Sequence, residues 1–416
     1  MIALSAGEAA RQIIATLPRQ PSLRVPLDDA LDAVLAETVT SPLDIPAWNN
    51  SAMDGYAARS SDVRGATPQT PVTLTVIETI AAGASPARAV GQGQCARIFT
   101  GAPLPEGADC VIRQEDSDLG AAQVRINSDR DAGQNVRRIG EDIRRGAQVL
   151  AAGSELGPAQ IGVLASVAVS HPVIVRRPRV AILASGNELA DLDQPDEILS
   201  GRKIASSNTH SLVAMVRRAG GEPVNLGIAL DDPDDLRQKM EAALVSDLVI
   251  TSAGISVGDH DYVRGVVESL GGELRFWRIR MRPGAPVGFG LIRGIPWIGL
   301  PGNPVSTMVT FELFVRPAIR WMAGRELPWR ESVRVRVADS IALGPRLQHF
   351  LRVVVSRQGE ALEARLTGPQ GSGILSSMAL ANALLIVPEG IQELAPGTMA
   401  DALLLDESKH RAEPAF

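Results

Sequence analysis

The sequence has few of the residues on which several common classes of protein depend. It contains two cysteines and five histidines in 416 residues, and neither type occurs in a metal-binding spacing such as C-x-x-C or H-E-x-x-H. A structural zinc site is therefore not expected. Aromatic residues make up 3% of the chain, which disfavours the stacking platforms that hold single-stranded nucleic acid.

Long hydrophobic runs and clusters of positive charge are also missing. No stretch of about 18 apolar residues is present, as a membrane-spanning helix would need, and the N-terminus has no basic segment leading into an apolar core. The net charge is −6, and the arginines are scattered rather than gathered into a basic footprint. We therefore expect a soluble, cytoplasmic protein that binds neither nucleic acid nor a membrane.

The first part of the chain combines helical and strand-like patterns. Residues 5–17 predict a helix, because Ser5 and Glu8 form a capping box before an apolar run with helical spacing and Pro18 ends it. A second helix is expected over residues 27–39. Residues 47–140 consist of short alternating apolar and polar pieces separated by glycine and proline, which is typical of a small β-rich domain.

From residue 178 onward, short apolar runs alternate with helical runs, which is typical of βαβ units on a parallel sheet. The expected strands are 180–184, 223–228, 248–252, 277–281 and 297–300. The expected helices are 208–219, 233–244, 262–270 and 304–322. Strand-like runs at 333–337 and 351–355 then predict a separate β domain.

The predicted fold is thus a multidomain α/β plus β protein. A three-layer α/β domain with a mostly parallel sheet comprises residues 1–26 and 178–326. A connecting domain comprises residues 27–46 and 141–177, an inserted β-rich domain residues 47–140, and a C-terminal β-barrel-like domain residues 327–416. The length and the hydrophobic share of 45% are sufficient for several cores.

Polar and glycine-rich segments follow the predicted strands of the α/β domain. Ligands of open α/β sheets bind outside the carboxyl ends of the strands, so these segments are expected to form one rim. The candidate binding residues there are Ser185, Glu188, Asp231, Gly254, Ser256, Gly258, Gly302, Asn303 and Ser306. Glycines allow close approach of a ligand, and a helix N-terminus offers N–H groups to an anion. Any one such turn also fits an ordinary connection, but four turns on one rim predict a phosphate or oxyanion site.

Three arginines alternate with apolar residues in the predicted strand 277–281 and just beyond it. Arg278, Arg280 and Arg282 would share one face because side chains alternate along a strand. Guanidinium groups suit bidentate contacts with oxyanions. A solvated strand end is the alternative interpretation.

Carboxylates on the same rim predict a magnesium ion. Glu188, Asp231 and Asp261 offer hard oxygen ligands beside the expected phosphates, which is how magnesium is usually held. Each acid alone also fits a helix cap or a solvated charge. Together they suggest magnesium-assisted cleavage of a phosphoanhydride, with Mg²⁺ as the cofactor.

Seven motifs, in order along nearly the whole chain, resemble those of the molybdopterin molybdenumtransferase (MoeA) family, which is similar to the C-terminal part of gephyrin. They are NSAMDGYA at 50–57, TGAP at 100–103, PEGAD at 105–109, RRIGED at 137–142, SGNEL at 185–189, GISVGDHD at 254–261 and LPGNPVS at 300–306. The joint occurrence of these motifs is very specific.

The resemblance implies an activity and a set of site residues. Members of the family insert molybdate into adenylyl-molybdopterin, release AMP with the help of a divalent ion, and form elongated homodimers of four-domain subunits. The resemblance places the pterin on the α/β rim. It also brings Asp54, Thr100, Arg137 and Asp142 of the inserted domain across the dimer interface. Glu188, Asp231 and Asp261 are then the acids for magnesium and chemistry, together with Asp54 and Asp142. The upstream adenylyltransferase and the recipient molybdoenzymes are the expected protein partners.

The chain departs from the family pattern at four positions. Ala253 replaces a glycine, Ala285 stands where lysine is frequent, and Arg278 and Arg282 stand where lysines are usual. Two other functions compete with the transferase. A molybdopterin adenylyltransferase shares the α/β domain but lacks the inserted and C-terminal domains, and a gephyrin-like scaffold would need an additional partner-binding segment.

Overall fold

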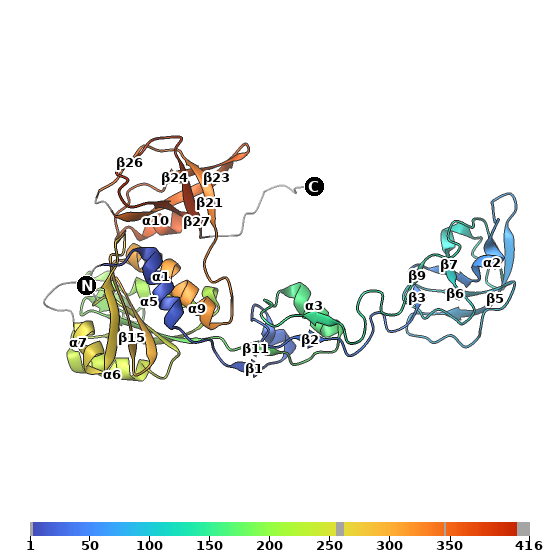
Figure 1. Cartoon of the computed structure of the whole chain (residues 1–416), viewed down its shortest axis with the longest axis horizontal. Coiled ribbons are helices and arrows are strands. Elements are labelled where there is room, and N and C mark those ends of the chain that lie inside the picture. The colour runs from blue at the N-terminus through green and yellow to red at the C-terminus, as the bar shows by residue number, and fades with distance from the viewer. Residues whose placement is uncertain (1–2, 255–261, 345–346, 406–416) are drawn as a thin grey trace. The chain divides into compact units, whose positions relative to one another are not determined.

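The computed structural model describes residues 3–254, 262–344 and 347–405, and the chain divides into two compact units (Figure 1). Unit 1 comprises residues 1–23, 32–34 and 174–416, and unit 2 comprises residues 24–31 and 35–173. The chain passes from one unit to the other within β1 (Ser22–Arg24), on both sides of residues 32–34, and within β11 (Val173–Val175). The division into four domains remains a prediction. No helix in the described part of the chain is long and apolar enough to cross a membrane.

Unit 1 is built on a six-stranded sheet. The strands, in spatial order, are β15 (Glu222–Ala229), β12 (Arg179–Ser185), β16 (Leu248–Ser252), β20 (Ile295–Leu300), β19 (Pro286–Ile292) and β17 (Gly272–Arg278). The first four run parallel, and the last two pair antiparallel. Strands buried on both faces have nearly continuous apolar sequences, as β16 has. The mostly parallel sheet is therefore as predicted.

Helices cover both faces of this sheet. One face packs against α1 (Ala6–Thr16), α5 (Ser207–Ala219), α8 (Pro304–Thr310), the π-helical turn η3 (Phe311–Val315) and α9 (Arg316–Met322). The other face packs against α6 (Pro233–Ala243) and α7 (Tyr262–Ser269) (Figure 1). Alternation along β12 sends Val180 and Ile182 to the first core and Ala181 and Leu183 to the second.

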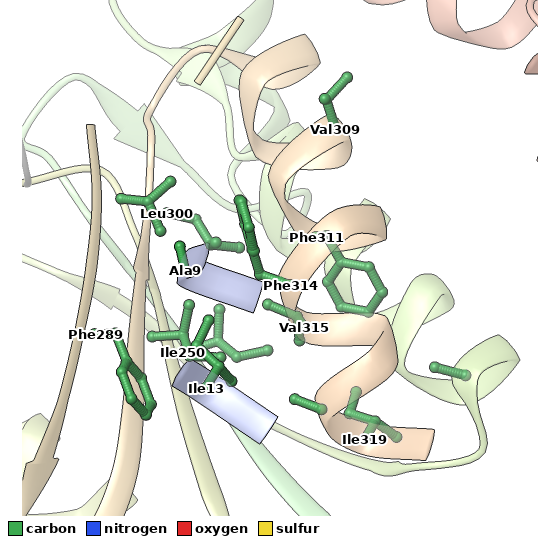
Figure 2. Packing of buried hydrophobic residues seen from close by; sticks show 14 of the residues in the cluster. Ala9, Ile13, Ile250, Phe289, Leu300, Val309, Phe311, Phe314, Val315 and Ile319 are labelled. Carbon is green, nitrogen blue, oxygen red and sulfur yellow. The ribbon is translucent and has the colours of Figure 1, made fainter. Parts of the chain in front are cut away.

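The predicted capping box of α1 is present. The Ser5 hydroxyl accepts a bond from the Glu8 N–H, and the Glu8 carboxylate accepts one from the Ser5 N–H at 2.8 Å. The apolar side of the helix places Ala9 and Ile13 in the core beside Phe314 (Figure 2). Full burial of one such aliphatic side chain contributes about 1.5 to 3 kcal/mol.

The C-terminal part of unit 1 is a closed five-stranded barrel. Its strands, in spatial order, are β23 (Gln348–Gln358), β24 (Ala361–Leu366), β21 (Ser332–Val337), β27 (Met399–Leu404) and β25 (Ala383–Val387). The pairing of β23 with β25 closes the barrel, as expected of a barrel-like domain. The short strand β18 (Met281–Arg282) of the α/β segment adds to β23, so the two parts of unit 1 share backbone pairing.

Shorter elements complete unit 1. They are β13 (Leu189–Ala190), α4 (Pro195–Leu199), β14 (Ile204–Ala205), β22 (Ile341–Ala342), α10 (Leu375–Leu380) and β26 (Glu393–Leu394).

Unit 2 contains the expected β-rich domain. Its five-stranded sheet has the order β7 (Cys110–Arg113), β4 (Gly55–Ala58), β6 (Gln94–Ile98), β5 (Val72–Ile80) and β8 (Gln123–Ile126). The other elements are η1 (Leu27–Ala30), β2 (Val39–Thr40), β3 (Asn50–Ser51), α2 (Ser60–Val63), η2 (Gln114–Asp116), β9 (Val136–Arg137), β10 (Gln148–Leu150) and α3 (Pro158–Ser166).

The predicted helix over residues 27–39 is wrong. Only the short 3₁₀ helix η1 forms, and Asp32 follows it in the left-handed region with φ of 61°. The next residues bond to different units: the Val34 carbonyl accepts the Val175 N–H in unit 1, and the Leu35 N–H donates to Ser154 in unit 2. Tertiary hydrogen bonding therefore overrides the helical periodicity of this apolar run.

Candidate functional site

A cavity of about 690 Å³ lies in unit 1 at the carboxyl ends of β12, β16 and β20. This is where ligands bind in open α/β sheets. Its polar lining residues are Glu188, Ser206, Ser207, Asn208, Ser252, Arg282, Asn303, Ser306, Gln370 and Ser372. Glycines, alanines, prolines and the larger apolar residues Leu189, Ile204, Met281 and Leu347 complete the wall. The strand-end residues of three predicted loops therefore meet at one cavity.

The turn after β12 places Glu188 on the cavity wall. The Leu189 N–H donates to the Gly186 carbonyl at 3.2 Å, and the Glu188 carboxylate lies directly over Gly186. A Cβ atom at Gly186 would be only 2.5 Å from a Glu188 carboxylate oxygen. A side chain at position 186 would therefore displace this carboxylate, and the φ of 144° at Gly186 also favours glycine there. Ser185, which ends the strand, is buried.

Asp231 joins two strand ends and is not among the cavity-lining residues. Its carboxylate accepts a bond from the Asn187 N–H at 3.1 Å, and its own N–H donates to the Asn187 side-chain oxygen at 3.2 Å. This reciprocal pair ties the loop after β12 to the loop after β15. The geometry thus gives Asp231 a positioning contact.

The loop after β16 enters the cavity wall through Gly254. Its φ is +70°, and a Cβ atom there would lie 2.4 Å from Val263 Cγ2. The preceding Ala253 also has a positive φ, 77°, which is uncommon for a residue with a side chain. The predicted site residues Ser256, Gly258 and Asp261 lie outside the described residues.

The N-terminus of α8 has fewer donors for a ligand than the sequence suggested. Asn303 is the N-cap residue, and Pro304 has no N–H. The Val305 N–H donates to the Ser372 carbonyl of the C-terminal barrel segment at 3.1 Å. The C-terminal part of unit 1 therefore takes one of the helix-end donors that we expected an anion to use. The buried Ser306 nonetheless lines the cavity.

Several cavity residues were not identified from the sequence. Asn208, in the first turn of α5, donates from Nδ2 to Ser252 Oγ at 2.9 Å and to the Gly302 carbonyl at 2.8 Å. It thereby joins two of the strand-end loops. The polar run 206–208 at the start of the helix was an available signal. Gln370 and Ser372 come from another predicted domain, so no rule about strand ends would have found them.

The three arginines do not form one row. The strand predicted over 277–281 is wrong, because β17 ends at Arg278 after an irregularity in its pairing and the chain pairs again only as β18. Arg282 lines the cavity. Arg280 forms an ion pair with Glu389 at 3.0 Å and donates to the Ala3 carbonyl, and Arg278 is exposed. Because the strand pairing is interrupted between β17 and β18, the three arginines have different surroundings.

Metal-ligating side chains are sparse in the described part of the chain. Among those residues there is no group of three or more His, Cys, Asp or Glu side chains that could hold a metal ion. Glu188 is the carboxylate among the described lining residues of the cavity. Mg²⁺ usually takes one or two protein carboxylates and completes its shell with phosphate oxygens and water. Glu188 fits that pattern as one ligand.

The other predicted site residues belong to unit 2. Asp54 precedes β4, and its Oδ1 accepts bonds from the Thr100 N–H at 2.8 Å and the Thr100 hydroxyl at 2.7 Å. The bond from the Thr100 N–H lowers the pKa of Asp54 most, and the bond from the Thr100 hydroxyl lowers it further. Arg137 on β9 is exposed, and the Asp142 N–H donates to the Ile45 carbonyl.

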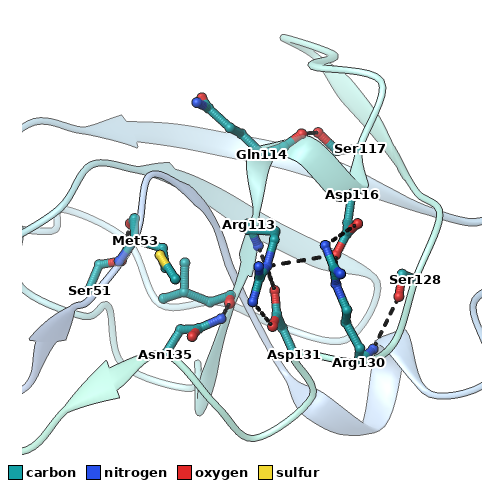
Figure 3. A network of polar contacts seen from close by, with 11 residues as sticks. Ser51, Met53, Arg113, Gln114, Asp116, Ser117, Ser128, Arg130, Asp131 and Asn135 are labelled. Carbon is teal, nitrogen blue, oxygen red and sulfur yellow. Dashed lines mark hydrogen bonds and ion pairs between the residues drawn. The ribbon is translucent and has the colours of Figure 1, made fainter. Parts of the chain in front are cut away.

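Figure 3 shows a network of charged residues around Arg113 and the turn η2 that follows it. Arg113 donates from Nε and Nη2 to Asp131 at 2.9 and 3.0 Å, and Arg130 makes a similar pair of bonds to Asp116. Burial of Asp131 alone would raise its pKa, but the bonds from Arg113 outweigh this effect and lower it. The Gln114 N–H in turn donates to the Asp54 carbonyl at 3.0 Å. The backbone of Asp54 is therefore hydrogen-bonded to a turn whose neighbouring residue Arg113 is held by Asp131.

Three family models match consecutive parts of the chain. They are the MoeA N-terminal region (domain I and II) over residues 4–168, a probable molybdopterin binding domain over residues 181–321, and the MoeA C-terminal region (domain IV) over residues 334–405. The cavity loops of the α/β sheet fall within the second match, and Asp54 and Thr100 fall within the first.

Individual proteins are similar over most of their length. A molybdopterin molybdenumtransferase of Nostoc sp. is 38% identical, covering 89% of this chain and 86% of the relative. A molybdopterin molybdenumtransferase of Bacillus subtilis is 32% identical, covering 96% of this chain and 94% of the relative. The crystal structure of a molybdopterin biosynthesis MoeA protein from Pyrococcus horikoshii has a TM-score of 0.81 at 30% identity, covering 98% of this chain and all of that one.

Proposed function

The chain belongs to the molybdopterin molybdenumtransferase family, and from this premise we propose that it acts in the cytoplasm to insert molybdate into adenylyl-molybdopterin, with release of AMP. The observation that carries the proposal is the cavity at the strand ends of unit 1. Its volume of about 690 Å³ lies in the range of small-molecule sites. A planar pterin with phosphate groups fits a site of this size and polarity.

The cavity lining supplies the contacts that such a substrate needs. Arg282 offers a guanidinium to phosphate or molybdate oxygens. Asn208 and the serine hydroxyls offer neutral hydrogen bonds to the polar edge of a pterin. Gly254 and Gly302 permit close approach of the ligand to the backbone. The two cysteines are buried in unit 2, and we propose that the sulfur ligands of molybdenum come from the substrate dithiolene.

We also propose that Mg²⁺ assists the reaction. Glu188 would hold it on the cavity wall, together with phosphate oxygens of the substrate and water, and Asp261 would be a further protein ligand. When bound, the ion would neutralise charge on the phosphoanhydride during cleavage. Asp231 would act by fixing the loop that carries Glu188, because its carboxylate is engaged by the Asn187 N–H.

The candidate residues fall in two separate units, and this division supports a homodimer with shared sites. Asp54, Thr100, Arg137 and Asp142 belong to unit 2, whereas Glu188 and the cavity belong to unit 1. A two-fold symmetric dimer brings the same two patches together twice. We therefore propose that each site takes unit 1 from one subunit and unit 2 from its partner.

Reconstitution tests the activity directly. The purified chain is incubated with adenylyl-molybdopterin, molybdate and Mg²⁺, and AMP and metallated pterin are measured by mass spectrometry. Glu188→Gln should lose most of the activity, whereas Glu268→Gln, on the exposed side of α7, should retain it. Formation of adenylyl-molybdopterin from ATP and molybdopterin would instead favour the adenylyltransferase alternative. A chain that binds molybdopterin but turns over neither substrate would favour a scaffold.

Complementation tests the shared site. Chains with Asp142→Ala and chains with Glu188→Ala are co-expressed with different tags, and the hybrid dimer is isolated by tandem purification. Each parent should be inactive, whereas the hybrid holds one intact site of two and should recover about half the wild-type activity. Hybrids as inactive as the parents would place the whole site within one subunit.

A further inference from the structure

Arg97 on β6 is a charged residue of unit 2 that the proposed chemistry leaves without a role. It lies directly opposite Tyr56 of β4 in the sheet register. Its guanidinium carbon is 4.8 Å from the centroid of the Tyr56 ring and 5.5 Å from that of Phe99. Both distances allow cation–π contact. Tyr56 is two residues beyond Asp54, and Phe99 is the residue before Thr100, so the guanidinium contacts both chain segments that form the Asp54 and Thr100 pair.

A third contact reaches the same pair by another path. Arg97 donates from Nη2 to the side-chain oxygen of Gln114 at 2.7 Å. The Gln114 N–H donates to the backbone carbonyl of Asp54 at 3.0 Å. Arg97 therefore connects β6, β4 and the turn η2. Its partners Tyr56 and Phe99 lie within two residues of Asp54 or Thr100 in sequence, and its partner Gln114 is hydrogen-bonded to Asp54.

The contacts of Arg97 do not satisfy all of its donors. Its Nη1 is buried and has no hydrogen-bond partner among the described residues. A buried donor without an acceptor disfavours folding. This incompletely satisfied guanidinium, together with its contacts to the segments around Asp54 and Thr100, points to a role beyond packing.

The Asp54 and Thr100 pair leaves one carboxylate oxygen available to a ligand. Both bonds from Thr100 go to Asp54 Oδ1, and Oδ2 receives none from any residue that the structure describes. Positive charge on Arg97 also adds to the Thr100 bonds in lowering the pKa of Asp54. On β7, which pairs with the other side of β4, Arg113 forms an ion pair with Asp131 at 2.9 Å.

We propose that Arg97 is a positioning residue that fixes the Asp54 and Thr100 pair so that Asp54 Oδ2 accepts a hydrogen bond from an N–H group of the pterin substrate. The inference rests on the proposed function, because it takes the substrate from there. Arg97 acts through the pair and does not touch the substrate. Loss of Arg97 should therefore weaken substrate binding more than turnover. This effect should disappear in a protein whose residue 54 cannot accept the hydrogen bond from the substrate N–H.

Steady-state kinetics with adenylyl-molybdopterin at saturating molybdate test this role. Arg97→Met keeps the apolar stem and should raise the KM by about ten-fold, the effect of losing one directed hydrogen bond to a charged group, with a smaller change in kcat. Arg97→Lys keeps the charge without the bidentate fork and should recover part of the loss. Arg125→Met, an exposed change on β8 of the same sheet, is the matched control.

A double-mutant cycle separates positioning from general stability. In the Asp54→Asn background, Arg97→Met should add little further loss, because the group through which it acts has already changed. Additive losses, or an unchanged KM in a well-folded Arg97→Met protein, would overturn the inference. If Arg97→Met does not fold, Gln114→Met removes one anchor and should raise the KM in the same way; an unchanged KM there also counts against the inference. An inactive wild-type protein would instead reject the proposed function.

Discussion

The carboxylate of Asp54 receives both hydrogen-bonding groups of Thr100 on a single oxygen. The backbone N–H lies 2.8 Å and the hydroxyl 2.7 Å from Oδ1, although the two residues are 46 positions apart in sequence. The pair joins the start of β4 to the end of β6. It gives the carboxylate a fixed orientation in a loop that would otherwise leave it free to rotate.

Thr100→Val tests how much the Thr100 hydroxyl contributes to lowering the pKa of Asp54. The variant keeps the backbone bond and loses the side-chain bond, so the pKa of Asp54 should rise toward its ordinary value of 3.8. If activity requires ionised Asp54, the acid limb of the pH profile should move to higher pH. Thr73→Val, an exposed change on β5, should leave the limb in place. A pH profile unchanged in Thr100→Val would show that the hydroxyl does not tune Asp54 during catalysis.

Asn208→Ala should damage the cavity without unfolding unit 1. The amide links Ser252 and the Gly302 carbonyl, and loss of two such bonds costs about 1 to 3 kcal/mol in all. We expect a melting temperature lowered by a few degrees and a KM for adenylyl-molybdopterin raised several-fold. Asn225→Ala, exposed on β15, serves as the control. Equal kinetic effects in the two variants would remove Asn208 from the binding surface.

Arg278 and Arg282 form a matched pair for the molybdate dependence. Both side chains are exposed, but Arg282 is among the described lining residues of the cavity and Arg278 is not. Arg282→Ala should therefore require several-fold more molybdate for half-maximal rate, Arg282→Lys should recover much of the loss, and Arg278→Ala should have the smaller effect. Titration of molybdate at fixed pterin substrate measures this directly. The reverse order of effects would contradict the cavity assignment.

Asp131→Asn should destabilise unit 2. The carboxylate is buried and accepts two bonds from the Arg113 guanidinium, and removing one partner of such a pair costs on the order of 3 kcal/mol. Because the folded-state pKa of Asp131 lies below 3.8, the stabilisation is complete above that value and is lost as the pH falls through the folded pKa. Wild-type unfolding followed from pH 7 to pH 2 should show this acid-side loss, and the variant should show less of it.

The two cysteines should resist alkylation in the native protein. Burial raises the pKa of Cys95 to about 12 and that of Cys110 to about 11, so the reactive thiolate is scarce at neutral pH. Iodoacetamide should modify neither residue in the folded chain and both in denaturant. Mass spectrometry of the intact protein gives the count. Rapid labelling under native conditions would show that unit 2 opens on the time scale of the reaction.

The elements that could be predicted are those in which local and tertiary preferences agree. The capping box of Ser5 and Glu8, and the proline after Asp232 at the start of α6, specify helix starts that the structure contains. Buried strands such as β12 and β16 are predominantly apolar in the interior of the sheet, and this pattern predicts a strand in each case. The loops at their carboxyl ends follow from topology, so the sequence alone places Glu188 and Gly254 at the strand-end site.

The predictions were wrong where hydrogen bonds to residues distant in sequence determine the backbone conformation. Residues 32–35 are apolar enough for a helix, but their hydrogen bonds go to partners in both units. The run from Arg278 to Arg282 alternates like one strand, yet β18 leaves the α/β sheet to pair with β23. Gln370 and Ser372 reach the cavity from a predicted separate domain. Periodicity carries no information about such partners.

The bond between the Val305 N–H and the Ser372 carbonyl makes the C-terminal barrel part of the binding surface. The barrel supplies a section of the cavity wall and also fixes the first turn of α8. A fragment ending near residue 326 should keep the α/β sheet. It would lack the part of the cavity wall formed by Gln370 and Ser372, and the first turn of α8 would lose its hydrogen bond to Ser372. Substitutions in the barrel core should then appear in genetic screens as defects in pterin use, because the barrel segment forms part of the cavity wall.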